Sequence, residues 1–293
     1  MGTELEIKAS ALPSEPLSPD AVLAVLAGRA TLRSPVSQLR LEAHYHDTAD
    51  GRLRRAGWTL RARQEDADIV ATTKGPGPLV GGVPQRLEIN APLSRLPAPG
   101  DPLPAPLAQA LAAAGLELDR WPSPSHRARI LRTRVDLEFG GCRAELAIDH
   151  GQVEAAGRRS EVRELELELL AGETSGLVEA AVLLGGHLGL RPGGWSKAAR
   201  GMALLGRLRE PRLRDQPSLL ERWEHLVDLE ERLRLGEAQW AGARTDAVAA
   251  LVAAGAPAEL AEERSGLRAR IDSAAHASLL WGLYVAAVRQ GAS

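Results

Sequence analysis

The residues with the clearest chemical potential lie at the start of the chain, where charged side chains occupy every second position of Glu4-Leu5-Glu6-Ile7-Lys8. Side chains alternate between the two faces of a β-strand, so Glu4, Glu6 and Lys8 share one face and the two apolar residues share the other. Carboxylates bind hard divalent cations, and an ammonium group can hold a phosphate. The spacing therefore predicts a strand that lines a site for a metal ion and an anion.

The same alternation recurs in later segments of the chain. Runs with one charged or polar face contain Arg61 and Arg63, Thr72 and Lys74, Arg86, Glu88 and Asn90, Arg132 and Arg134, Glu145 and Asp149, and Glu164, Glu166 and Glu168. Taken singly, each run is explained by an antiparallel sheet with one solvated face. Taken together, acidic residues concentrate in the first and last runs and basic residues in the middle ones, which favours a closed sheet with a charged interior. Buried like charges need counter-ions, and a divalent cation with a polyanion would supply them.

The order of expected elements places these runs in one domain, followed by helices. Predicted strands span residues 4–10, 37–46, 58–64, 68–74, 84–91, 129–139, 142–149 and 161–170, and predicted helices span 18–27, 105–114 and 174–188. Beyond Leu205, residues 216–236 and 258–289 carry apolar side chains at three- and four-residue spacing, which is typical of amphipathic helices. We therefore expect a β-rich domain at 1–207 and a short helical domain at 208–293.

Composition narrows the class of protein. The chain has 293 residues, a formal net charge of −2 and a single cysteine, Cys142, so it has neither a bulk attraction for nucleic acid nor an internal disulfide framework. Neither a secretory signal pattern at the N-terminus nor an uncharged apolar run of the roughly 18 residues that suggest a membrane span is apparent. These features predict a cytoplasmic protein that acts on a small molecule, with no nucleic-acid or membrane partner.

Short motifs with a recognisable order extend from residue 4 to residue 201. They are the Glu4–Lys8 run, His44-Tyr45-His46-Asp47-Thr48-Ala49-Asp50, Leu60-Arg61-Ala62-Arg63, Thr73-Lys74-Gly75, Gln85-Arg86-Leu87-Glu88-Ile89-Asn90, the acidic run 164–169, and Ser196-Lys197-Ala198-Ala199-Arg200-Gly201. This series resembles the ExExK signature and the later motifs of the CYTH superfamily, the triphosphate tunnel metalloenzymes. The resemblance implies an α+β fold, in which an eight-stranded antiparallel β-tunnel with flanking helices is followed by the C-terminal all-α bundle.

The resemblance also implies roles for individual residues. Metal ligands for Mg²⁺ or Mn²⁺ would be Glu4, Glu6, Glu166 and Glu168, with Asp149 and Glu164 as helpers. Phosphate-binding residues would be Lys8, Arg61, Arg63, Lys74, Arg86, Arg132, Arg134 and Lys197. Catalytic roles would fall to Lys8 or Lys74, as the acid for the leaving phosphate, and to Glu88, which would orient a basic neighbour or the attacking water. Arg127 and Arg129 offer a competing register for the arginine pair.

The resemblance is greatest to bacterial inorganic triphosphatases in which a CYTH domain precedes a helical CHAD domain. Residues 208–293 are few for a complete CHAD domain and contain only two histidines, His225 and His276, so we expect a truncated or divergent CHAD-like segment. The expected reaction is hydrolysis of inorganic tripolyphosphate to pyrophosphate and phosphate. Thiamine or nucleoside triphosphate hydrolysis, adenylate cyclisation and non-catalytic polyphosphate binding remain alternatives, although no aromatic platform for an organic group is evident. Oligomeric state and metal preference are left open.

Overall fold

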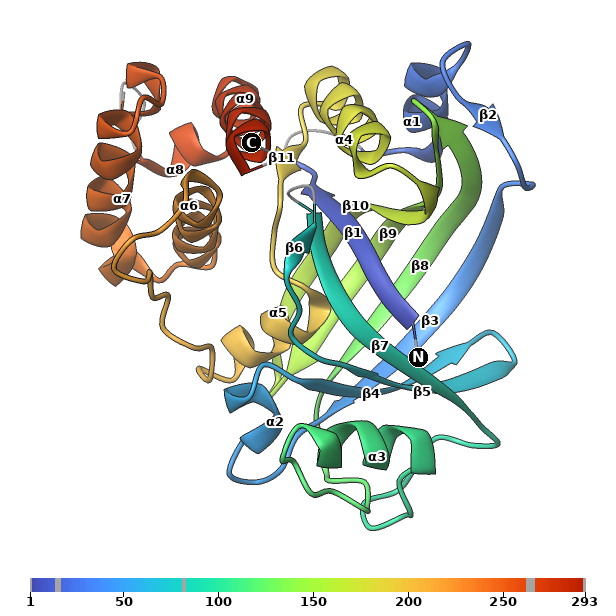
Figure 1. Cartoon of the computed structure of the whole chain (residues 1–293). Coiled ribbons are helices and arrows are strands. Elements are labelled where there is room, and N and C mark those ends of the chain that lie inside the picture. The colour runs from blue at the N-terminus through green and yellow to red at the C-terminus, as the bar shows by residue number, and fades with distance from the viewer. Residues whose placement is uncertain (1, 14–16, 81–82, 262–266, 292–293) are drawn as a thin grey trace.

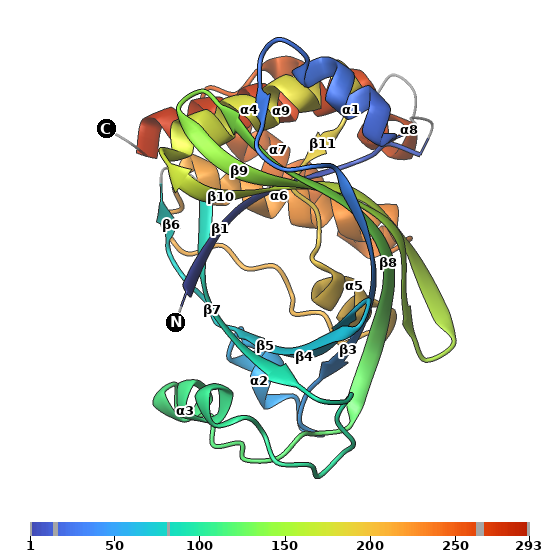
Figure 2. The same cartoon turned by 90° about the vertical axis from the view of Figure 1, so that its right-hand side faces the viewer.

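The computed structural model describes residues 2–13, 17–80, 83–261 and 267–291, and its centre is a closed antiparallel barrel (Figures 1 and 2). The barrel strands are β1 (Gly2–Ser10), β3 (Ser37–His46), β4 (Thr59–Glu65), β5 (Asp68–Lys74), β7 (Val83–Leu93), β8 (Pro124–Phe139), β9 (Cys142–Ala155) and β10 (Arg158–Gly172). They pair in the order β1-β10-β9-β8-β3-β4-β5-β7, and pairing of β7 with β1 closes the ring. The expected eight-stranded antiparallel tunnel is confirmed.

Three two-residue strands extend this sheet outside the ring. β2 (Thr31–Leu32) pairs with β8, β6 (Leu79–Val80) pairs with β7, and β11 (Arg191–Pro192) pairs with the end of β1. The last pairing matters for the site, because it ties the chain that follows α4 to the strand bearing the Glu4–Lys8 run.

Strand register collects charged residues on the inner face. Glu6 lies opposite Glu168 and Lys8 lies opposite Glu166 across the β1–β10 pair. Ile7, between them in sequence, is buried on the outer face, where helices cover the sheet. Alternation of side chains therefore turns one polar and one apolar stripe in the sequence into a charged lumen and a hydrophobic outer layer.

Helices cover the barrel from several sides. They are α1 (Pro19–Leu26), α2 (Arg52–Arg55), α3 (Ala105–Ala113), α4 (Thr174–Leu188) and α5 (Lys197–Leu204). Helix α1 begins as expected at Ser18, whose side chain accepts a hydrogen bond from the Ala21 amide, with Pro19 in the first turn. Leu177 and Leu184 of α4 join the same hydrophobic cluster as Ile7, whereas α3 lies at the opposite side of the barrel (Figure 1).

The C-terminal segment is helical, but its division differs from the prediction. It contains α6 (Leu219–Arg234), a 3-10 turn at Ala238–Trp240, α7 (Ala241–Ala253), a second 3-10 turn at Ala258–Ala261, α8 (Leu267–Ile271) and α9 (Ala274–Gly291). Helix α7 was not predicted because it is rich in alanine and its apolar stripe is weak. Within the stretch 258–289, where the sequence predicts helical structure, the described residues form the second 3-10 turn, α8 and α9.

One hydrophobic cluster connects the C-terminal helices to the barrel. Leu184 of α4, Leu226 of α6 and Leu280 of α9 are all fully buried members of it. Residues 207–216, where the two expected domains meet, form neither helix nor strand, and the domain boundary near 208 stays a prediction. Among the helices that the structure describes, none combines the length and the apolar character needed to cross a membrane.

Candidate active site

A cavity of about 560 Å³ lies within the barrel, and its walls carry the charged faces of the strands. The predicted residues that line it are Glu4, Glu6, Lys8, Arg61, Arg63, Lys74, Arg86, Glu88, Arg132, Arg134, Asp149, Glu166, Glu168 and Lys197. Glu164 is the one predicted site residue outside this lining, and it is buried behind Lys197. The sequence motifs therefore converge on one chamber.

The structure also separates the two candidate arginine pairs of β8. Arg132 and Arg134 line the cavity. Arg127 instead forms an ion pair with Glu154 at 2.6 Å, and Arg129 lies 3.9 Å from the same carboxylate. Because the two pairs have opposite parity along a strand, only one of them can face the lumen.

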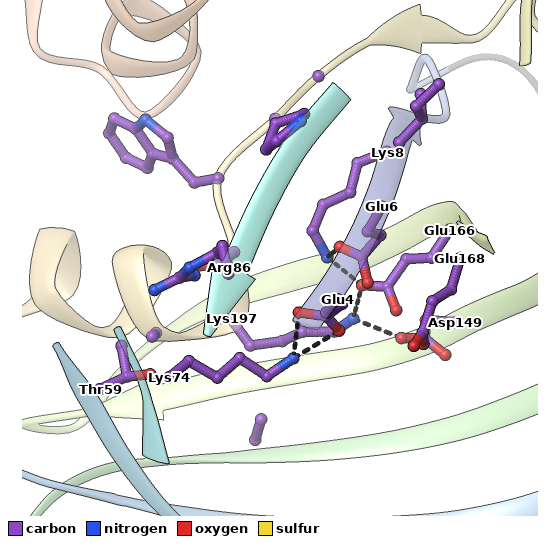
Figure 3. Close-up of a pocket in the computed structure, with 18 of the residues that line it drawn as sticks. Glu4, Glu6, Lys8, Thr59, Lys74, Arg86, Asp149, Glu166, Glu168 and Lys197 are labelled. Carbon is purple, nitrogen blue, oxygen red and sulfur yellow. Dashed lines mark hydrogen bonds and ion pairs between the residues drawn. The ribbon is translucent and has the colours of Figure 1, made fainter. Parts of the chain in front are cut away.

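One group of carboxylates in the cavity is well supplied with cations. The Lys197 Nζ lies 2.7 Å from Glu166 and also contacts Asp149 (Figure 3). The same Nζ lies 2.5 Å from Glu164. Arg132 donates to Asp149 at 2.7 Å. Burial alone would raise the pKa of Glu166, but the charges of Lys197, Lys8 and Arg132 hold that pKa well below its usual value. Oxygens of Asp149, Glu164 and Glu166 lie within 4.8 Å of one another, a spacing that could hold a metal ion.

A second group of carboxylates carries excess negative charge. The Lys74 Nζ lies 2.6 Å from both Glu4 oxygens and 2.9 Å from Glu88. Burial, together with repulsion from Glu4 and Glu6, nevertheless raises the pKa of Glu168 to about 7. Burial and repulsion from Glu6 also raise the pKa of Glu4. Additional positive charge would therefore stabilise this group, and an all-carboxylate donor set suits a hard divalent cation.

The opposite wall of the cavity is basic. On β4, Leu60 and Ala62 are fully buried in the outer core, so Arg61 and Arg63 point inward. Burial and the neighbouring charge of Arg61 lower the pKa of Arg63. Repulsion between these guanidinium groups would be relieved by a bound anion, and guanidinium groups suit bidentate contact with phosphate oxygens. The cavity thus offers cation sites on one wall and polyanion sites on the other.

The sequence of this chain is similar to those of known proteins. The model of the CYTH domain matches residues 3–202. The chain belongs to the CYTH family. An inorganic triphosphatase of Haemophilus influenzae is 29% identical over 164 residues, a match that covers 55% of this chain and 44% of that protein, so less than half of the relative is represented.

Two solved structures are also similar to this CYTH chain. A protein from Hippeastrum, described as a putative adenylyl cyclase with a dominant triphosphatase activity, is 20% identical with a TM-score of 0.43, over 70% of this chain and 97% of that one. A putative adenylate cyclase from Bacillus halodurans is 16% identical with a TM-score of 0.38, over 73% of this chain and 97% of that one.

Several residues of the CYTH cavity were not among those predicted. Glu145 lines it opposite Glu168; the sequence placed Glu145 on the same charged face as Asp149 but assigned it no role in the site. Aromatic side chains, which the sequence analysis did not place near the site, also line the cavity: Tyr45, Trp195, Trp223, Trp281 and Tyr284. Three of these rings come from α6 and α9, together with Glu224 and Asp228 of α6. No local pattern in the sequence associates these helices with the lumen.

Proposed function

We propose that this protein is a metal-dependent inorganic triphosphatase that hydrolyses tripolyphosphate to pyrophosphate and phosphate. The observation that carries the proposal is the division of one barrel cavity into a carboxylate wall with excess negative charge and an arginine wall with excess positive charge. A linear triphosphate with a divalent cation complements both walls at once. Similarity to an inorganic triphosphatase from Haemophilus influenzae supports this substrate.

The carboxylates suit Mg²⁺ or Mn²⁺. Glu4, Glu6 and Glu168 would hold such an ion, because burial and mutual repulsion raise the pKa of Glu4 and of Glu168 although Lys74 contacts Glu4 and Lys8 contacts Glu6. Glu166, with Asp149 and Glu164 as helpers, would provide further oxygens close by. A bound divalent ion would supply Lewis acidity to phosphate oxygens and would lower the pKa of a bound water molecule.

The protein's own residues would position the phosphates and receive the developing charge. Arg61, Arg63, Arg86, Arg132 and Arg134 would hold phosphate oxygens in the orientation needed for in-line attack. Phosphoryl transfer depends chiefly on such positioning and electrostatic stabilisation. Lys8 or Lys74 would donate a proton to the leaving phosphate, and Glu88, at 2.9 Å from the Lys74 Nζ, would orient that ammonium group or the attacking water.

Phosphate release tests the proposal directly. Tripolyphosphate, ATP and thiamine triphosphate are each incubated with the protein in Mg²⁺, in Mn²⁺ and in chelator. Strong metal-dependent release from tripolyphosphate, with little from the other two, is the expected result. Tight binding of tripolyphosphate without release from any substrate would refute the enzyme and favour a non-catalytic binding module.

An organic triphosphate is the second candidate substrate, because aromatic side chains border the cavity. Trp195, whose indole N–H donates to Asp228 of α6, and Tyr45 of β3 both line it. Trp223 and Trp281 contribute less, since their indole N–H groups donate to backbone oxygens of Leu280 and Leu190 inside the core. Preferential release of phosphate from ATP or thiamine triphosphate in the same assay would favour this reading.

A further inference from the structure

The segment from Arg191 to Arg200 delivers Lys197 to the cavity but has little secondary structure of its own. Its first two residues form β11, and the Gly193 amide donates to the Lys8 oxygen at 2.8 Å. Helix α5 begins only at Lys197, where the Ser196 hydroxyl accepts a hydrogen bond from the Ala199 amide. The position of Lys197 therefore depends on the elements that pack against this segment.

Helix α6 contacts the segment at its beginning and its middle. The Arg191 side chain, 1% exposed, pairs with Glu230 at 2.9 Å and with Glu231 at 2.8 Å. The Trp195 indole N–H donates to Asp228 at 2.7 Å. Three carboxylates in neighbouring turns of α6 thus hold two points of the chain that lead directly into Lys197.

Close packing fixes the intervening glycines from both sides. Gly193 and Gly194 have φ angles of 75° and 123°, which favour glycine. A Cβ on Gly194 would lie 2.5 Å from the Ser10 hydroxyl of β1, and one on Gly193 would lie 3.0 Å from a methyl of Val227 on α6. The segment is therefore enclosed between the first barrel strand and α6.

A third contact reaches the carboxylate that touches Lys197. The Arg200 Nη2 lies 3.8 Å from Glu231 and 3.9 Å from Glu164. The other oxygen of Glu164 lies 2.5 Å from the Lys197 Nζ. Charged groups therefore connect α6 to the cavity through Arg200 and Glu164.

The remaining C-terminal helices anchor α6 in turn. Glu230 is fully buried, and it accepts hydrogen bonds from His276 of α9 at 2.8 Å and from Arg244 of α7 at 3.2 Å. Buried ion pairs are costly relative to apolar packing, so they are weak evidence for stability. They do define relative positions closely, because each partner must meet the other at hydrogen-bonding distance.

We propose that α6 is a positioning element of the active site, in which Asp228, Glu230 and Glu231 hold the Arg191–Arg200 segment so that the Lys197 ammonium lies inside the cavity. This inference rests on the proposed triphosphatase function for its kinetic consequence. It gives the C-terminal helices a role in anion binding by the barrel, carried out through contacts with the segment that bears Lys197.

Trp195→Phe is the informative variant. It keeps an aromatic ring but removes the N–H donated to Asp228, which retains its ion pair with Arg232 at 3.0 Å, so the fold should persist. Trp240→Phe is the matched control. The Trp240 indole N–H donates to Glu237 at 2.9 Å, and Arg232 lies over the Trp240 ring, but Trp240 is outside the Arg191–Arg200 segment. Tripolyphosphate affinity is measured by calorimetry, and kcat/KM by phosphate release, for both variants.

A double-mutant cycle with Lys197→Met separates positioning from general stability. We expect Trp195→Phe to weaken tripolyphosphate binding and kcat/KM by about tenfold in the native background, and by less than about twofold when Lys197→Met is already present. The Trp240→Phe control should stay within about twofold of wild type in both backgrounds.

Two outcomes would overturn the inference. One is an equal loss from Trp195→Phe with and without Lys197, and the other is unchanged affinity in Trp195→Phe. Affinity is measured independently of turnover, so the two proposals can fail separately. Wild-type protein that binds tripolyphosphate without hydrolysing it would refute the proposed function. The affinities of the double-mutant cycle would still decide whether α6 positions Lys197.

Discussion

Replacing Lys197 by methionine tests the electrostatic reading of the cavity most directly. Its ammonium group contacts Asp149, Glu164 and Glu166, whose exposed fractions are 0%, 1% and 5%. Methionine keeps most of the apolar volume and removes the charge. Breaking a buried ion pair from one side costs about 3–5 kcal/mol, because the remaining charge is left uncompensated. Lys8 and Arg132 still contact Glu166, so we expect a loss near 3 kcal/mol in the free energy of unfolding.

The loss should depend on pH in a definite direction. The Lys197 charge lowers the pKa of Glu166 and of Asp149, so these carboxylates are ionised in the native protein over the ordinary pH range. Without the ammonium group their pKa values rise, and protonation at acidic pH relieves part of the repulsion. The difference between wild type and Lys197→Met should therefore be larger at pH 8 than at pH 5.

Urea unfolding in the presence of chelator provides the measurement, with Lys197→Arg as the control that retains the charge. We expect the arginine variant to lose less stability than the methionine variant at pH 8. A methionine variant that loses under about 1 kcal/mol, or that loses the same amount at pH 5 and pH 8, would show that the ammonium group is not the main counter-charge of the three carboxylates.

Three further results are expected. Glu6→Ala should abolish metal-dependent phosphate release while tripolyphosphate affinity stays within about tenfold of wild type, and loss of both in a folded variant would argue against a role confined to the metal. Arg134→Ala should lower kcat/KM by at least about tenfold, whereas Arg129→Ala, on the same strand but outside the cavity, should change it by under about twofold. A larger loss of kcat/KM in Arg129→Ala than in Arg134→Ala would contradict the strand register. Burial and the nearby His46 lower the pKa of His126 from 6.5 to about 4, so its contribution to stability is complete above pH 6.5 and is lost as the pH falls to about 4. That contribution to the free energy of unfolding is worth up to about 3 kcal/mol. The urea midpoints at pH 7 and pH 4 should therefore differ less in His126→Phe than in wild type. An equal difference in both proteins would exclude His126 as the source of the pH dependence.

Alternation along the strands made most of the barrel and its lining predictable. A period of two is a local property, so Glu4, Glu6 and Lys8 could be assigned to one face without knowledge of the strand's neighbours. The arginines of β8 show the limit of that reasoning. Both Arg127 and Arg132 occupy plausible faces of the same strand, and the sequence contains no local feature that chooses between them.

Strand pairing made the choice. Arg132 lies opposite Asp149 on β9, and Arg127 lies opposite Glu154, whose carboxylate holds it outside the cavity. Each face of β8 thus has its own acidic partner. Such a choice requires the register between strands and the direction of barrel closure, which depend on contacts among residues far apart in the chain.

The sequence by itself determined the strand faces, the charged lumen and the existence of C-terminal helices, since these follow from side-chain periodicity within single elements. Only the tertiary structure placed α6 beside the segment that carries Lys197. The pairing of Arg191 with Glu230 and of Trp195 with Asp228 joins residues separated by more than 30 positions. No short-range pattern encodes such pairs, because they form only when the hydrophobic faces of α4, α6 and α9 pack into one core.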